Sequence, residues 1–212
     1  VMGTEVFSTC QRLESVEWPA YMTVVPDNTF ECLGLGDNFL TTITLPEGVT
    51  EIGRSAFYGR SSIKKIYLPS TLISVEDYAF YNCRNLVSIP ENIFSNNPNV
   101  TSFKSTFSSC TNITSIPENI FSNNTMATDF SYCFYNCNSL TSIPSNLFAN
   151  NTLVTTFQSC FSGLNLTSIP SNLFANNTAV TNFSECFSTC ISLTSIPSSL
   201  FANNTAVTNF SE

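Results

Sequence analysis

The chain has 212 residues and a formal net charge of −8, and its seven cations all lie before residue 105. A surface without Lys or Arg cannot neutralise phosphates, which argues against nucleic acid or anionic lipid as a partner of the second half. The absence of histidine excludes Ser-His-Asp and Cys-His catalysis. No apolar run approaches the roughly 18 residues of a membrane span, so we expect no membrane insertion.

Residues 1–39 form a degenerate N-terminal repeat region. Residues 6–10 match the second half of the repeat that follows, whereas the pattern blurs over residues 17–39, which hold the only tryptophan, Trp18. We interpret this region as an imperfect repeat, with a small domain junction as the alternative. The chain begins and ends inside a repeat and shows no polar cap, which predicts a fragment of a longer protein.

Residues 40–85 contain repeats with a step of 23 residues. One copy reads I-T-L-P-E-G-V-T-E-I-G-R-S-A-F-Y-G-R from Ile43, and the next reads I-Y-L-P-S-T-L-I-S-V-E-D-Y-A-F-Y-N-C from Ile66. Apolar residues recur at spacings of two and three, with Pro-Glu-Gly and Pro-Ser as breaks. This pattern predicts short extended segments that are joined by tight turns.

Residues 86–212 contain longer repeats, with steps of 26 or 27 residues between the isoleucines of an L-x-x-I-P phrase. The clearest copy, from Leu166, reads L-T-S-I-P-S-N-L-F-A-N-N-T-A-V-T-N-F-S-E-C-F-S-T-C. An apolar pair and an Asn-Asn dipeptide are inserted after the proline. The preceding Ser-Asn predicts the cap of one helical turn, and Asn-Asn predicts its end through left-handed geometry. A second extended piece, V-T-x-F, follows.

A fixed period of this length is the signature of a stacked-repeat solenoid. One unit cannot bury its own Leu, Ile and Phe, but stacked units form a continuous core of equivalent residues. We therefore treat all three regions as one solenoid. A buried aromatic stack is predicted from the corner phenylalanines Phe57, Phe80, Phe107, Phe134, Phe161 and Phe187.

The short repeats resemble a known family. The pattern L-P-x-x-[VL]-x-x-[IV]-x-x-x-A-F-x-x-C-x-x-L-x-x-I, carried almost whole from Leu68 to Ile89, resembles the BspA-like leucine-rich repeats of bacterial surface proteins. The long repeats are similar to a related surface-protein variety. The resemblance covers residues 40–212 and implies a leucine-rich-repeat solenoid at the cell surface or in the extracellular space, with a role in adhesion. The fold expected is short parallel strands plus a helical turn in each 23–27-residue unit.

The nine cysteines fall mainly into columns. The F-x-x-C column holds Cys10, Cys83, Cys110, Cys137 and Cys190, and a second column holds Cys133, Cys160 and Cys186. Stacked columns satisfy the Cα separation of a disulfide. Because other units place Leu, Thr or Ala at these positions, we favour buried free thiols, which behave as small apolar groups. The C-x-x-x-C pairs suit a metal, but without histidine we expect neither a metal site nor a cofactor.

The candidate binding residues stand between the buried Leu and Ile of each L-x-x-I phrase. They are Thr114, Ser115, Thr141, Ser142, Thr167, Ser168, Thr194 and Ser195. One interpretation is that Thr and Ser are soluble fillers of a solvated strand face. The functional one is an uncharged hydroxyl surface for proteins or glycans. A second threonine ladder is formed by Thr101, Thr155, Thr181 and Thr208.

A small group of cations interrupts the acidic background. It consists of Arg60, Lys64, Lys65 and Arg84, with Tyr67 alongside. Lys64 and Lys65 replace Thr-Ser in their unit, so we expect them to face solvent. The alternatives are an ordinary solvated patch and a contact point for an acidic partner.

The sequence thus predicts a non-catalytic module that adheres to a host or cell-surface protein or to a glycan. The alternative is a structural spacer that projects another domain from the cell envelope. A glycan hydrolase would need two paired carboxylates, and the acids of the long repeats are too scattered to supply them.

Overall fold

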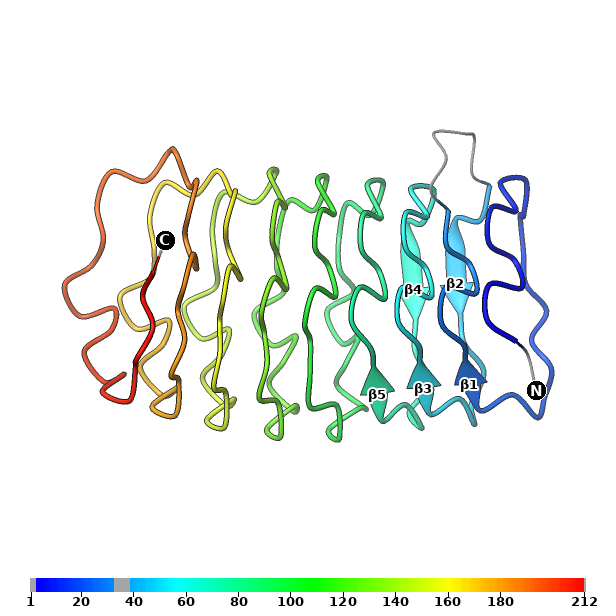
Figure 1. Ribbon diagram of the computed structural model, residues 1–212, viewed down its shortest axis with the longest axis horizontal. Coiled ribbons are helices and arrows are strands. Elements are labelled where there is room, and N and C mark those ends of the chain that lie inside the picture. The colour runs from blue at the N-terminus through cyan, green and yellow to red at the C-terminus, as the bar shows by residue number, and fades with distance from the viewer. Residues whose placement is uncertain (1–2, 33–38, 212) are drawn as a thin grey trace.

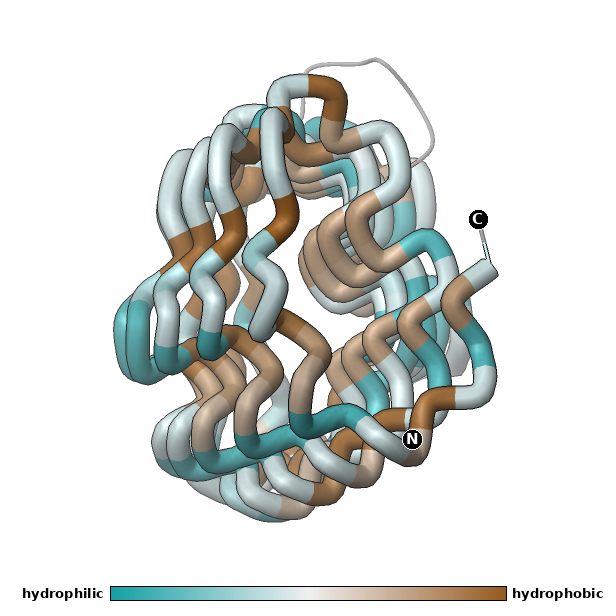
Figure 2. Tube along the Cα trace, turned by 90° about the vertical axis from the view of Figure 1, so that its left-hand side faces the viewer, coloured by the Kyte–Doolittle hydropathy of each residue, from teal (hydrophilic) through white to brown (hydrophobic). Residues whose placement is uncertain are grey.

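The computed structural model of the chain describes residues 3–32 and 39–211. Within these residues the chain winds through successive coils that lie side by side along one axis (Figure 1). Seen along that axis, the coils nearly superimpose (Figure 2), so residues at equivalent places in the repeat form columns. The solenoid predicted from the repeat period is confirmed.

The described strands are short and belong to two parallel sheets. One sheet joins β1 (Val24–Val25), β3 (Glu51–Ile52) and β5 (Ser74–Val75), and the other joins β2 (Thr42–Thr44) and β4 (Lys65–Tyr67). Each strand pairs with the strand one coil away, so that Ile43 lies beside Ile66 and Ile52 beside Val75. These four side chains are buried, and the sequence alignment of the two short repeats placed them in the same columns.

The long repeats pair at a different place in the unit. Isolated parallel bridges link one column through the coils: Ser102, Asp129, Thr156, Asn182 and Asn209. Our expectation of a strand at each L-x-x-I phrase is therefore wrong for the described long repeats, where pairing falls on the V-T-x-F segment. There the amide and hydroxyl of Thr155 both donate to the carbonyl oxygen of Thr128, at 2.9 and 3.1 Å. This pair of hydrogen bonds holds neighbouring coils together.

The helical turn expected after the proline does not form in the described residues. The segment makes consecutive β-turns instead, in which Ile93 donates to Pro90 and Asn97 donates to Phe94, at 3.2 and 3.0 Å. A helix of one turn has little to offset its costly nucleus. The side chain of Asn97 is also fixed from outside, because its amide donates to the carbonyls of Pro69 and Leu72 one coil earlier.

Left-handed residues occur at the phenylalanine corners and not at the Asn-Asn dipeptides, where we expected them. In most coils, positive φ angles stand two residues before and two residues after the corner ring, as at Tyr78 (63°) and Asn82 (61°) around Phe80. Each such pair reverses the chain around the ring and turns the ring inward. The side chains of the Asn-Asn dipeptides instead donate hydrogen bonds to carbonyl oxygens of the preceding coil, as Asn150 and Asn151 do.

Phenylalanine rings form the centre of the core. The predicted corner stack is confirmed, with ring centroids 5.3 Å apart for Phe30 and Phe57 and 5.5 Å apart for Phe57 and Phe80, at nearly parallel planes. The long repeats add two further columns, for example Phe121 on Phe148 at 6.1 Å. Spacings in this range are those of favourable offset stacking, so the insertion enlarges the aromatic core.

A column of buried asparagines runs beside the rings. It consists of Asn97, Asn124, Asn151, Asn177 and Asn204. The amide nitrogen of Asn151 donates to the carbonyl oxygens of Asn124 (2.8 Å) and Phe121 (3.1 Å) in the preceding coil, and the later members repeat this arrangement. These side chains add a second donor to buried carbonyls that already accept a turn hydrogen bond, as Phe121 does from the amide of Asn124, and so connect the turns of successive coils.

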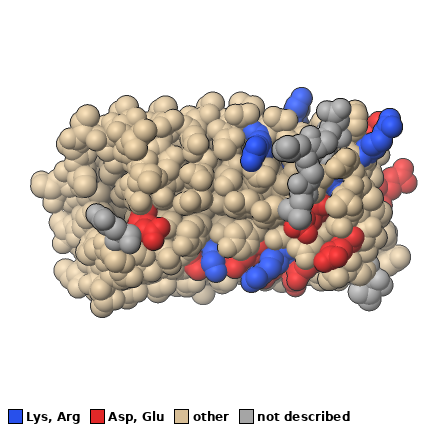
Figure 3. All heavy atoms as spheres, turned by 45° about the horizontal axis from the view of Figure 1, so that its top comes forward, with Lys and Arg blue, Asp and Glu red and all other residues tan. Residues whose placement is uncertain are grey.

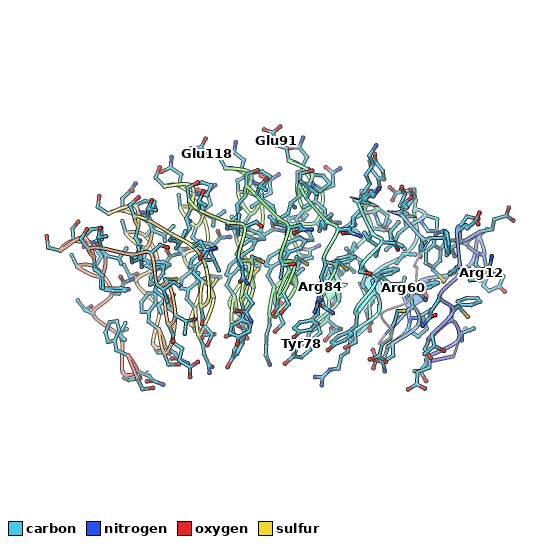
Figure 4. All side chains as sticks on the ribbon, turned by 90° about the horizontal axis from the view of Figure 1, so that it is seen from above. Arg12, Arg60, Tyr78, Arg84, Glu91 and Glu118 are labelled. Carbon is cyan, nitrogen blue, oxygen red and sulfur yellow. The ribbon has the colours of Figure 1, made fainter. Side chains whose placement is uncertain are left out.

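The stack is arched. In Figure 4 the coils fan apart on the side that carries Glu91 and Glu118 and converge on the side that carries Tyr78. The first side is therefore convex and the second concave.

Candidate binding surface

The hydroxyl residues predicted for binding are exposed, and in every coil but that of Leu193 and Ile196 they stand between buried neighbours. In one coil Ile113 and Ile116 are buried, whereas Thr114 and Ser115 are exposed. The later coils also expose Thr141, Ser142, Thr167, Ser168, Thr194 and Ser195. We call these eight residues the Thr-Ser face. Glu118, which closely follows one of its segments, lies on the convex side (Figure 4).

Lys64, Lys65 and Tyr67 extend this arrangement into the short repeats. All three are exposed, as expected for the two lysines. Lys65 and Tyr67 belong to β4 and lie beside Thr42 and Thr44 of β2. The exposed lysines of this coil therefore lie next to exposed threonines of the neighbouring strand.

Arg60 does not belong to the cationic surface patch that we expected. Its side chain is fully buried, and its guanidinium donates to the backbone carbonyl oxygens of Phe7 and Cys10, each at 2.9 Å, and of Phe30. It occupies the F-x-x-C column, which points into the core. Burial lowers the pKa of this guanidinium from its ordinary value.

The second threonine ladder is occupied with hydrogen bonds between coils. The hydroxyls of Thr155, Thr181 and Thr208 each donate to the carbonyl oxygen of the threonine in the preceding coil, at 3.1 to 3.3 Å. A hydroxyl that donates its proton within the protein has only its lone pairs left for a ligand. This ladder is therefore structural.

A groove that the sequence did not suggest lies between the first coil (residues 3–26) and β2. Its volume is about 360 Å³, and its lining includes Glu14, Ser15 and Trp18 on one side and Thr41, Thr42 and Thr44 on the other. The available signal was the blurring of the repeat around the only tryptophan. An irregular unit next to a regular one leaves a gap in the stack.

A tyrosine cluster on the short repeats was also missed. Tyr58 stacks on Tyr81 with ring centroids 4.6 Å apart, and Tyr78 meets Tyr81 edge to face at 5.7 Å. Burial, followed by the neighbouring Tyr81 and Glu31, raises the pKa of Tyr58 above its ordinary value. The repeat alignment contained the signal, since it places Tyr58 and Tyr81 directly after successive corner phenylalanines.

Charged side chains gather on the N-terminal half. In Figure 3 blue atoms lie over that half alone, and most are close to red atoms. Asp77 joins two of these cations, with oxygen-to-nitrogen distances of 3.6 Å to Arg54 and 3.1 Å to Lys104. The bond to Asp77 raises the pKa of Lys104. These three side chains link successive coils.

The cysteine columns lie in the core, except for Cys10, which is exposed. The thiols of Cys83, Cys110, Cys137 and Cys190 each donate to a phenylalanine carbonyl oxygen one coil earlier, at 3.1 to 3.5 Å, as free thiols do. The described residues contain no group of His, Cys, Asp and Glu side chains arranged to hold a metal ion. Across the same residues, we find no helix with the length and apolar character needed to span a bilayer.

Comparisons with known proteins agree with this architecture. A family model described as the BspA type leucine rich repeat region matches six copies over residues 1–89, 36–160 and 88–211. A leucine-rich repeat protein from Bacteroides ovatus has a similar structure, with a TM-score of 0.57 and 20% identity over 99% of this chain and 57% of that one. A leucine-rich repeat protein of T. pallidum gives a TM-score of 0.46 and 22% identity over 66% of this chain and 69% of that one. No curated protein matches the sequence.

Proposed function

Because the chain belongs to the family of BspA-type leucine-rich repeats, we propose that it is a non-catalytic binding module of a secreted or cell-surface protein. In this proposal the Thr-Ser face, extended by Lys64, Lys65 and Tyr67, contacts host proteins or glycans. The family is typically non-enzymatic and supports a role in binding. The ligand class and the face are our inference.

The observation that carries the proposal is the repetition of one exposed hydroxyl pair on consecutive coils. Thr141 and Ser142 recur as Thr167 and Ser168 one coil later. Identical weak contacts on a rigid array add through effective concentration, so the whole face binds far better than one coil. An uncharged surface of donors and acceptors suits the hydroxyls and amides of glycans and polypeptides.

The test is a glycan and extracellular-matrix protein array probed with the chain immobilised in many copies on fluorescent beads. We expect retention on at least one spot. A triple variant with Thr141→Lys, Thr167→Lys and Thr194→Lys should lose this retention, because three cations with long side chains interrupt the face.

A matched variant places the same charge on the same coils outside the face. It carries Ser145→Lys, Ser171→Lys and Ser198→Lys, at positions that are exposed after each proline. This variant should bind like the unmodified chain. Equal loss in both variants would assign the binding to net charge and count against the Thr-Ser face.

The second candidate is a spacer that holds another domain away from the cell envelope. The continuous phenylalanine and asparagine columns favour it, because they give a rod its stiffness and need no ligand. If every spot on the array stayed silent, the spacer would replace the binding module as the better proposal.

A further inference from the structure

The groove beside β2 opens because one coil fails to complete the strand face. On one side β2 pairs in parallel with β4, and Thr42 lies beside Lys65. On the other side stand residues 14–18 of the first coil, where the described residues form no strand and no backbone hydrogen bond to β2. The first coil is nevertheless held at its corner, where Phe7 stacks on Phe30 at 5.4 Å. The first coil thus packs on the next coil at the phenylalanine corner, but it does not pair with β2 along the strand face.

The open edge of β2 offers backbone donors and acceptors to the groove. The carbonyl oxygen of Thr41 accepts from Lys64 and Lys65, and the amide of Leu45 donates to Tyr67, all across the β4 side. Because backbone groups of successive strand residues point to opposite sides, those of Thr42 and Thr44 point toward the first coil. A strand edge of this kind is a template for a hydrogen-bonding ligand.

Trp18 turns one face of its indole away from the core. Its ring meets Phe30 at 5.5 Å and 75°. Both faces of Phe30 are covered, by Phe7 at 5.4 Å and by Phe57 at 5.3 Å. Phe30 must therefore present its edge to a face of Trp18, and the opposite indole face points away from the core. Trp18 is partly exposed and lines the groove.

The polar lining is rich in oxygen and carries no cation. Glu14, Ser15, Thr41, Thr42 and Thr44 are all exposed and supply four hydroxyls and one carboxylate to the groove. Without Lys or Arg in its lining, the groove does not suit phosphate, sulfate or carboxylate ligands. Its volume lies within the range of about 300 to 1,000 Å³ found for small-molecule sites, which combine an aromatic wall with a few convergent polar groups.

We propose that this groove binds a neutral oligosaccharide, with one sugar ring stacked on the face of Trp18 that points away from Phe30. The sugar hydroxyls bond to the carboxylate of Glu14 and to the threonine hydroxyls and backbone groups of β2. The inference rests on the proposed function and names its ligand class at one defined position. A peptide strand fits the edge of β2, but this indole face and the four hydroxyls favour a ligand with an apolar ring face and a hydroxyl rim.

The only tryptophan of the chain makes the groove directly observable. The experiment titrates the chain with cellotetraose, mannotetraose, tetra-N-acetylchitotetraose and lacto-N-tetraose, and separately with pentalysine amide, while tryptophan emission is recorded. We expect a saturable change with at least one sugar and none with pentalysine. Saturation-transfer NMR on the sugar protons provides a readout that does not depend on fluorescence.

Two matched pairs of variants locate the site. Glu14→Gln should weaken the sugar about tenfold, as expected for the loss of one charge-assisted hydrogen bond, whereas the exposed Glu118→Gln should leave the affinity unchanged. Thr41→Val should weaken binding, whereas Thr152→Val, at an exposed position of a distant coil outside the Thr-Ser face, should not. These side chains are exposed, so the folded array should tolerate all four changes.

No response to any sugar would overturn the proposal, and so would a response that Glu14→Gln and Thr41→Val leave intact. A response to pentalysine alone would instead identify a site for cationic peptides. The proposal for the groove and the proposal for the Thr-Ser face can be refuted independently of each other. A silent array with a responsive Trp18 would refute adhesion and keep the groove, whereas array binding that depends on Thr141, Thr167 and Thr194 but not on Glu14 would do the reverse.

Discussion

The guanidinium of Arg60 donates a hydrogen bond to the backbone carbonyl oxygen of Cys10, 2.9 Å away and 50 residues earlier in the chain. In four other coils this column holds a cysteine whose thiol donates to a phenylalanine carbonyl, as Cys83 does to Phe57. Arg60 makes the equivalent bond to Phe30 and then reaches one coil further, to Phe7 and Cys10. One buried cation thus fastens the irregular first coil to the regular array.

We predict that Arg60→Ala lowers the free energy of unfolding of the first coils by about 2 to 4 kcal/mol, because three carbonyls lose a charged donor, although Phe7 and Cys10 keep the backbone amides of their turns. Arg60→Cys should cost about half as much, since a thiol can restore the bond to Phe30. Urea unfolding followed by Trp18 emission reports on this region, because Trp18 packs on Phe30. Equal losses in the two variants would show that the reach to the first coil contributes nothing.

Neighbouring asparagines provide a second test. Asn151 is fully buried and donates to two carbonyls, whereas Asn150 is exposed and donates to Ser122 at 2.9 Å. Asn151→Ala should destabilise the chain by about 1 to 3 kcal/mol, because two buried carbonyls each lose one of two donors and keep only the backbone amide of their turn. Asn150→Ala should cost less than about 1 kcal/mol, since water replaces the lost bond. Thermal unfolding followed by circular dichroism would compare them, and similar losses would refute the asparagine column as a source of stability.

The period and columns of the fold were predictable because they depend only on which residues recur and at what spacing. The stack of Phe57 on Phe80 follows from their equivalent places in the repeat. The burial of Arg60 was equally available, since the same alignment put it in the cysteine column. It was missed because arginine is rarely buried without a partner, and here its partners are backbone carbonyls, which a sequence does not display.

Local conformation was harder to predict than the columns. Ser-Asn before an apolar pair is a helix-start signal, but contacts between coils decide the outcome at Asn97, whose side chain bonds to the preceding coil. The groove at Trp18 depends on a strand that fails to pair. The irregular residues around Trp18 indicated that the repeat was imperfect, but they did not indicate the size or the lining of the gap.

Two glycines with positive φ angles should differ in their tolerance of a methyl group. A Cβ on Gly163 (φ 76°) would stand 2.3 Å from the side-chain oxygen of Asn136, whereas one on Gly48 (φ 99°) would meet nothing within 4 Å. Gly48→Ala should cost about 1 kcal/mol of backbone strain. Gly163→Ala should cost more, because Asn136 must also move. Urea midpoints of the two variants would measure this, and the opposite ranking would contradict the close approach at the corner.

The buried thiols predict a loss of stability in alkaline solution. Burial raises the pKa values of Cys133, Cys160 and Cys186 well above their ordinary value in the folded chain, whereas unfolding returns them to about 8.5. Below that pH both states are protonated and the full stability is present. Above it the unfolded chain loses its protons first, so each thiol lowers the free energy of unfolding by about 1.4 kcal/mol per pH unit.

Urea midpoints measured between pH 7 and 9.5 in the presence of a reductant should therefore stay level up to about pH 8.5 and then fall. The variant Cys133→Ala, Cys160→Ala and Cys186→Ala should make the fall shallower, because alanine does not titrate, and the remaining fall comes from Cys83 and Cys137, whose pKa values burial also raises. Alkylation of the native chain at pH 8 should modify the exposed Cys10 well before these three, since an alkylating reagent needs an accessible thiolate. Rapid alkylation of all four, or a midpoint that is level to pH 9.5, would place the second cysteine column outside the core.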